Sequence, residues 1–200
     1  MIRELYPTKV KTFSSGFDRK RDAELSMHML GLVQEYSYPV SMYEPVGGVG
    51  YHTKFGIEKL PWMSAYNAMI REKMSDFYIE LHGGLGRWCT LFYSWGMVYG
   101  KGAYTQNHVH PGATLSSAYY CSVPRNMRTG DGDLRVHDPR PAAAFEQPNA
   151  SDTIIHIPAH EGEGHIFPGW LSHDSTPHYT EEPRIAIVTN MVIKPKVPEG

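Results

Sequence analysis

Two histidines separated by one residue begin the stretch Asn107–Cys121, which reads NHVHPGATLSSAYYC. In an extended strand, side chains two residues apart point to the same side, so His108 and His110 can reach one point in space. Bonds of roughly 2 Å between a metal and imidazole nitrogens suit two rings placed in this way. The HxH pair therefore predicts part of a metal site.

A third histidine, His173, completes a candidate ligand set. It ends the segment HIFPGWLSH, after a strand-like HIF and a Pro-Gly turn. An HxH pair with one distant histidine is a facial set of three ligands, and it leaves coordination positions open as a catalytic metal requires. Zn²⁺ and Fe²⁺ both accept three imidazoles, so the residues alone do not choose the metal.

Arg184 begins the strand-like run RIAIVTN, and alternate residues of that run, ending at Asn190, share its face. An arginine on the inward face of an apolar strand is costly unless a carboxylate meets it. Its planar fork suits bidentate binding of a ligand carboxylate. If Arg184 points outward instead, a surface ion pair with Glu181 or Glu182 is the alternative.

The elements that must position these residues fall into two groups. Helical spacing of apolar residues predicts helices over 18–36 and 61–82. From residue 88 onward the chain is aromatic and β-prone, and no helical stripe intervenes, which predicts an all-β sandwich or barrel. The later strand candidates are 104–110, 114–122, 133–137, 153–157, 164–167 and 184–193.

Small side chains flank the histidines. Thr114, Ser116, Ala118 and Tyr120 share one face of their strand and leave room for a bound small molecule. The polar segment 124–152 is long for a loop, and we expect it to act as a lid over the site.

Composition narrows the class of protein. The 200 residues carry a formal net charge of −2, which offers no basic footprint for nucleic acid or for a membrane surface. No apolar run approaches the ~20 residues of a membrane span. Cys89 and Cys121 lie in apolar runs, which favours buried thiols in a reducing, cytoplasmic setting. We expect a single domain, with helical and loop support over 1–86, a β core over 87–193 and a tail over 194–200.

Motif order then indicates a family. HxH, SSAYY, GDLRVHDPR, HIFPGWLSH and RIAIVTN occur in sequence, and the C-terminal half resembles the 2-oxoglutarate/Fe(II) oxygenases of the prolyl-hydroxylase-like superfamily. The resemblance implies a mainly β (α+β) fold: a double-stranded β-helix, or jelly roll, with N-terminal helices packed on one side. It also implies iron held by His108, His110 and His173, and 2-oxoglutarate whose distal carboxylate pairs with Arg184. Tyr99 and Tyr120 match positions that contact the co-substrate, and Asn190 matches a position lining the site.

Two departures from the family pattern are evident. The superfamily usually has HxD or HxE, whereas His110 fills the carboxylate position here, so Asp174 or Asp138 is an alternative source of a carboxylate ligand. Ala186 stands where many members carry a serine that helps to hold the distal carboxylate. That change removes one hydrogen bond, worth roughly 0.5–1.5 kcal/mol.

Other functions stay open at this point. A cupin-type dioxygenase or isomerase with three histidines would share the fold but has no general need of Arg184, and a non-catalytic jelly-roll binding module would hold no metal. Tyr99 and Tyr120 are equally readable as core aromatics. For an oxygenase, the sequence permits a small-molecule or peptide substrate, indicates no nucleic acid or membrane partner, and permits a homo-oligomer.

Overall fold

The computed structural model describes residues 7–36, 38–39, 50–84, 88–140 and 153–195. Two α-helices are present in this part of the chain, α1 (Arg19–Tyr36) and α2 (Ser64–His82), and the short 3₁₀ helices η2 (Ile57–Lys59) and η3 (Pro61–Met63) precede α2. The strands are β1 (Lys11–Ser14), β2 (Tyr38–Pro39), β3 (Gly50–His52), β4 (Trp88–Tyr99), β5 (Leu115–Ser122), β6 (Leu134–His137), β7 (Ile154–Ile157), β8 (Glu163–Pro168), β9 (His173–Ser175) and β10 (Arg184–Pro195).

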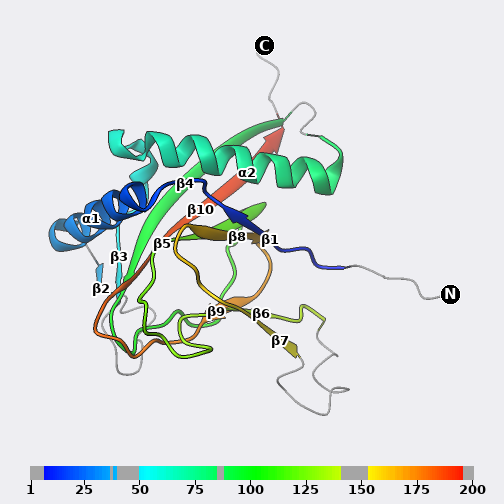
Figure 1. Cartoon of the computed structure of the whole chain (residues 1–200). Helices are drawn as coiled ribbons and strands as arrows, with labels where there is room; N and C mark the ends of the chain where they lie inside the picture. Colours follow the sequence, from blue (N-terminus) through cyan, green and yellow to red (C-terminus); the bar gives the residue numbers. More distant parts are fainter. Residues whose placement is uncertain (1–6, 37, 40–49, 85–87, 141–152, 196–200) are drawn as a thin grey trace.

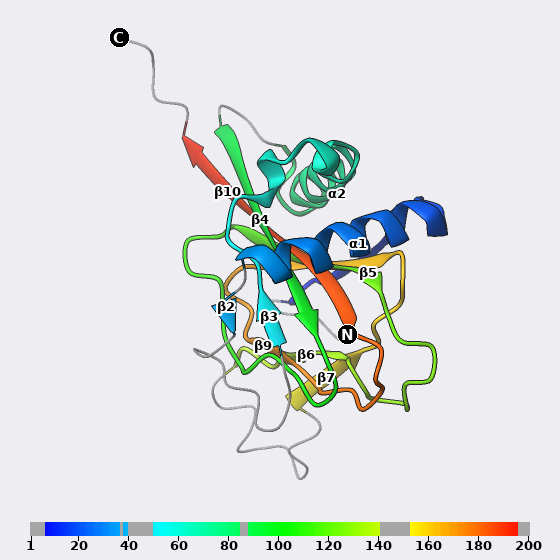
Figure 2. The ribbon, with the colours of Figure 1, turned by 90° about the vertical axis from the view of Figure 1, so that its left-hand side faces the viewer.

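The strands form two antiparallel sheets that face each other. The large sheet has the order β1-β8-β5-β10-β4-β3-β2, and the small sheet has the order β7-β6-β9. Figures 1 and 2 show α1 and α2 on one face of the large sheet and the small sheet on the other. The expected jelly roll with helices packed on one side is confirmed.

Alternation along the large sheet separates a helix-facing side from a site-facing side. On β10, Ile185 and Ile187 belong to the buried cluster that packs against α1 and α2. Arg184, Ala186, Val188 and Asn190 occupy the other side, because neighbouring side chains of a strand point to opposite faces. Burial of the first set holds the helices in place, and the second set faces the small sheet.

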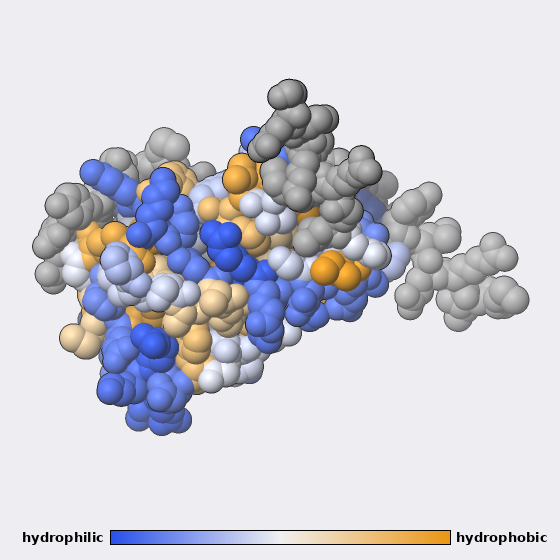
Figure 3. Space-filling model, turned by 90° about the horizontal axis from the view of Figure 1, so that it is seen from above, coloured by the Kyte–Doolittle hydropathy of each residue, from blue (hydrophilic) through white to orange (hydrophobic). Residues whose placement is uncertain are grey.

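Both predicted helices form, and their apolar residues pack where the spacing indicates. Leu25 and Met29 of α1 are buried, as are Tyr66, Ile70 and Phe77 of α2. Gly83 ends α2 in the left-handed region, with φ at 78°, where glycine has no steric cost. Seen from this side, the described surface mixes hydrophilic residues with hydrophobic patches (Figure 3).

Several expectations need correction. Residues 104–110 form no strand; an isolated bridge between His108 and His173 is what remains of it. The segment 124–152 is not one loop, because β6 lies within it and pairs with β7 and β9. Residues 141–152 lie outside the described residues, so the lid stays a prediction. Cys121 is a buried free thiol, as predicted, and the Cys89 side chain lies outside the described part.

Within the described residues, neither helix is long and apolar enough to cross a membrane.

Candidate functional site

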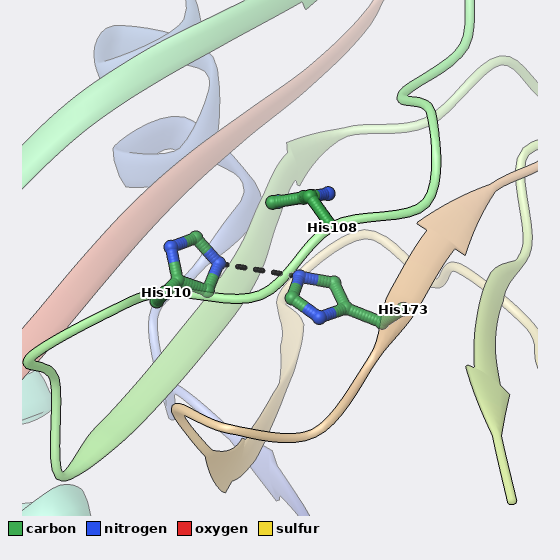
Figure 4. Close-up of side chains that lie close together, drawn as sticks. All are labelled: His108, His110 and His173. Carbon is green, nitrogen blue, oxygen red and sulfur yellow. Dashed lines mark hydrogen bonds between the residues drawn. The ribbon is translucent and has the colours of Figure 1, made fainter. Parts of the chain in front are cut away.

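The three predicted histidines converge between the two sheets. His108 and His110 lie on the segment before β5, and His173 begins β9 (Figure 4). Two backbone hydrogen bonds hold the segments together: His108 N–H donates to the His173 carbonyl at 2.9 Å, and His173 N–H donates to the His108 carbonyl at 3.0 Å. These backbone hydrogen bonds therefore fix the segment that carries His108 and His110 against the start of β9.

The distances between the rings fit one metal ion. One ring nitrogen of each histidine lies within 4.8 Å of the other two, and His110 Nε2 is 3.2 Å from His173 Nε2. Two nitrogens bound to one metal at roughly 2 Å and at a right angle are about 3 Å apart. Small side-chain adjustments would therefore bring all three nitrogens to one ion.

Hydrogen bonds on the far side of two rings set their protonation. His108 Nδ1 is 2.8 Å from the Gln106 carbonyl oxygen, and His173 Nδ1 is 2.8 Å from the Leu171 carbonyl oxygen. A carbonyl accepts only, so each Nδ1 carries the proton and each Nε2 keeps its lone pair. This arrangement is typical of metal-binding histidines, whose second nitrogen donates to a carbonyl or carboxylate.

Burial favours the neutral form of the His110 and His173 imidazoles. Burial and then the neighbouring His173 and His108 lower the pKa of His110 to about 3, whereas burial followed by His108 lowers the pKa of His173 to about 4. A metal ion binds the neutral ring, so protons compete little for these two residues near neutral pH.

These lowered pKa values predict a pH dependence of the metal-free protein. Between pH 6.5 and about 4 the unfolded chain binds protons at His110 and His173 that the folded chain does not, so stability falls as pH falls. Each residue contributes at most about 1.4 kcal/mol per pH unit. Thermal unfolding of the apoprotein across this pH range should show the loss of stability. In a His110→Gln/His173→Gln variant, stability should fall less steeply with falling pH. An equal slope in that variant would contradict the prediction.

Neither alternative carboxylate joins the cluster. Asp174 follows His173 and points to the opposite face of β9, where its Oδ1 meets Arg135 Nε at 2.5 Å and its Oδ2 meets His137 Nε2 at 2.8 Å. Asp138 forms an ion pair with Arg140, whose backbone N–H it also accepts. Asp174 is among the residues that line the cavity, but the carboxylate oxygens of both alternatives are engaged by other side chains.

Arg184 points inward and is only 5% exposed, so the alternative of a surface ion pair is wrong. Its guanidinium carbon lies 5.3 Å from the ring centroid of Tyr99 and 5.7 Å from that of Tyr120, on the two strands beside β10. Arg184 Nη1 donates to the Gly132 carbonyl at 2.8 Å, and Nη2 donates to Ser175 Oγ at 3.2 Å. Glu181 instead pairs with Lys101. Among the described residues, no carboxylate pairs with this buried cation.

One cavity of about 80 Å³ joins the histidines to Arg184. His108, His110 and His173 line one part of it, and Arg184 lines another. Other residues lining the cavity come from both sheets and include Trp95, Met97, Tyr99, Thr105, Ala118, Tyr120, Phe167, Ser175, Ala186 and Val188. Of the four residues predicted to share one face beside the histidines, Ala118 and Tyr120 border this space, whereas Thr114 and Ser116 are not among the residues that line it.

Asn190 lies next to His110. It is buried beside His110 rather than among the residues that line the cavity. Its Nδ2 lies 2.9 Å from the Tyr93 hydroxyl and 3.4 Å from His110 Nδ1, and its Oδ1 has no partner among the described residues. Asn190 therefore contacts a ligand candidate and not the space where a co-substrate fits.

Gly169 holds the turn between β8 and β9 against the HxH segment. Its carbonyl accepts the His110 N–H at 2.8 Å, and a Cβ at this position would collide with the backbone carbonyl of Ala113. We predict that Gly169→Ala lowers the free energy of unfolding by about 1–3 kcal/mol and weakens metal binding. Gly31→Ala in α1 is the matched control: a Cβ there meets no atom within 4 Å, so stability should rise by about 0.5–1 kcal/mol. Thermal unfolding and metal titration check both variants. A Gly169→Ala protein with the stability and metal affinity of the unaltered protein would contradict the packing argument.

Sequence reasoning missed two polar groups of the cavity. Ser175 shares the face of His173 on β9, and the alternation of a strand could have indicated it. Thr105 lies three residues before His108, and its Oγ1 is 2.6 Å from the Tyr99 hydroxyl. The sequence could not predict the contact between Thr105 and Tyr99, because it depends on the path of the loop after β4.

Comparison with known families identifies the chain. The profile of a family described as "Putative 2OG-Fe(II) oxygenase" matches residues 93–190, which contain all seven predicted site residues. The match covers just under half of the 200 residues and spans the strands that carry the candidate site. The oxygenase is therefore an enzyme whose metal is Fe(II) and whose co-substrate is 2-oxoglutarate.

Solved structures with a similar fold support the same architecture. A prolyl-4-hydroxylase from Pseudomonas putida superposes with a TM-score of 0.66 at 13% identity, over 95% of the oxygenase and 94% of that chain. A prolyl hydroxylase from Trichoplax adhaerens, in complex with a hypoxia inducible factor peptide fragment, gives a TM-score of 0.62 at 14% identity, over 92% and 83% of the chains. The epimerase SnoN from nogalamycin biosynthesis, in complex with Fe³⁺ and alpha ketoglutarate, also gives 0.62 at 14% identity, over 92% and 79%. At these identities the likeness concerns the fold. A search of curated protein sequences finds no significant match.

Proposed function

We propose that the protein hydroxylates a small-molecule or peptide substrate, using iron held by His108, His110 and His173 and 2-oxoglutarate held by Arg184. The observation that carries this proposal is one cavity with three neutral imidazoles in one part and, in another, a buried arginine that no carboxylate of the described residues pairs with. 2-Oxoglutarate matches both parts, because its keto acid group can chelate a metal at the histidines and its second carboxylate can pair with the arginine. A three-histidine cupin would leave the inward arginine unexplained.

The imidazoles fit Fe(II) by their lone pairs and their spacing. His108 and His173 present Nε2, because their Nδ1 protons are donated to carbonyls. Asn190 lies beside His110 Nδ1, and if its amide is turned so that Oδ1 accepts the Nδ1 proton, His110 Nε2 is also free to bind. We assign Asn190 to the orientation of His110 rather than to the co-substrate.

Three neutral ligands leave the metal its full double charge, which suits a dianionic co-substrate. When bound, Fe(II) supplies the redox chemistry that joins dioxygen to 2-oxoglutarate and substrate, with succinate and CO₂ as co-products. Arg184 holds the distal carboxylate by charge-assisted hydrogen bonds, and the rings of Tyr99 and Tyr120 keep its guanidinium in place. The apolar walls, such as Ala186 and Val188, exclude water from the reacting groups.

The substrate would approach beside His110, where an aromatic group reaches the surface. Trp95 lines the cavity, its ring centroid lies 5.7 Å from that of His110, and it contacts Phe55, which is 65% exposed. An apolar or cyclic group on a small molecule or peptide fits such a surface. The similar prolyl hydroxylase with a bound peptide fragment supports a peptide as one substrate class.

Anaerobic titration tests the proposed function directly. Apoprotein is mixed with Fe(II) and then with 2-oxoglutarate while visible absorption is recorded. A weak charge-transfer band that requires both additions is expected, and succinate should form once air is admitted. A band with Fe(II) alone, or none with both, would contradict the proposal.

A further inference from the structure

Ser175 places a hydroxyl group in the cavity from the small sheet, opposite the strand that carries Arg184. It ends β9, is 5% exposed, and lies on the same face of that strand as His173. Ala186 of β10, two residues after Arg184, brings only a methyl group to the same space.

The hydrogen bonds of Ser175 leave its proton unassigned. A serine hydroxyl has two acceptor positions and one donor. Ser175 Oγ accepts from the Thr105 N–H at 2.9 Å and from Arg184 Nη2 at 3.2 Å, which fills both acceptor positions. Among the described residues, no group accepts the Ser175 proton. The hydroxyl is therefore a donor held in one orientation beside the guanidinium.

Arg184 shows the same need for an acceptor. Gly132 and Ser175 each receive one of its N–H groups, and Nε–H is buried without a partner in the described part of the chain. A buried donor that lacks an acceptor is costly, so an adjacent pair of such donors indicates a ligand with at least two acceptor oxygens. A carboxylate meets this requirement and also neutralises the arginine.

We propose that Ser175 donates its hydroxyl proton to the distal carboxylate of 2-oxoglutarate, so that the carboxylate is held between the two sheets by Ser175 and Arg184. This inference rests on the proposed function. It supplies from β9 the hydrogen bond that Ala186 cannot provide from β10. It also makes Ser175 specific for ligands with a second carboxylate, because the keto acid group lies toward the histidines.

Calorimetry on the Fe(II)-loaded protein without oxygen tests this assignment with two ligands. 2-Oxoglutarate has the distal carboxylate, and 2-oxopentanoate has the same chain without it. Ser175→Ala should weaken 2-oxoglutarate binding by about tenfold to a hundredfold, because the lost hydrogen bond is to a charged group. The affinities for 2-oxopentanoate and for Fe(II) should stay within about twofold of the unaltered protein, which would also show that the variant folds.

Ser122→Ala, at the end of β5 and outside the cavity, is the matched control and should change neither affinity. Equal weakening of both ligands by Ser175→Ala would mean that Ser175 only supports the loop, and unchanged 2-oxoglutarate binding would mean that its proton goes elsewhere. Either result overturns this inference while leaving the proposed function intact. If the unaltered protein fails to bind 2-oxoglutarate, the proposed function itself fails.

Discussion

Arg184→Ala is expected to remove 2-oxoglutarate binding while Fe(II) still binds. Truncating one partner of a buried, hydrogen-bonded charge pair costs about 2–5 kcal/mol, a factor of about 30 to several thousand in affinity. Arg184 is 5% exposed, and no other described cation is aimed into the cavity. Calorimetry with 2-oxoglutarate, alongside metal analysis of the same sample, separates the two effects.

Arg140→Ala serves as the control for that experiment. Arg140 is a well-exposed arginine that pairs with Asp138 outside the cavity, so its removal should leave both affinities unaltered. Wild-type affinity for 2-oxoglutarate in Arg184→Ala would disprove the assignment of Arg184. Joint loss of iron and co-substrate would indicate a general collapse of the site instead.

His173→Ala is expected to abolish Fe(II) binding. The ring provides one of three nitrogens that lie within 4.8 Å of one another, and its loss leaves a bidentate HxH pair. Even groups that merely orient a metal ligand contribute 10–100-fold to affinity, so losing the ligand should cost more than about a hundredfold. Metal content after gel filtration measures the loss.

The control is His160→Ala, which deletes an exposed imidazole before β8. It should retain iron, and its spectrum with 2-oxoglutarate should match that of the unaltered protein. Full iron occupancy in His173→Ala would rule out the triad and point to another ligand set.

Local patterns in the sequence predicted a large part of the fold. The apolar spacing of Leu25 and Met29, and of Tyr66 and Ile70, predicted two helices that pack on one sheet. Alternation along β10 placed Arg184 and Asn190 on one face. The pairing of β9 with β6 could not be predicted, because three-residue strands joined across distant parts of the chain carry little pattern.

The candidate site, too, was predictable only in part from the sequence. The spacing of His108 and His110 placed both rings correctly although their segment forms no regular strand, because a bridged extended backbone suffices. Backbone groups such as the Gly132 carbonyl that holds Arg184 leave no trace in residue type. The chemistry of Asp174 suits a metal ligand, but its position next to His173 in an extended strand directs it to the opposite face.

The paired backbones of His108 and His173 have a consequence for how the apoenzyme meets its metal. Two reciprocal backbone hydrogen bonds join these residues in a structure that holds no ion, so folding and not chelation assembles the metal site. Small zinc domains behave in the opposite way and unfold when stripped. Removing iron with a chelator should therefore leave the far-ultraviolet circular dichroism of this enzyme unchanged, and iron should reload without a slow refolding phase.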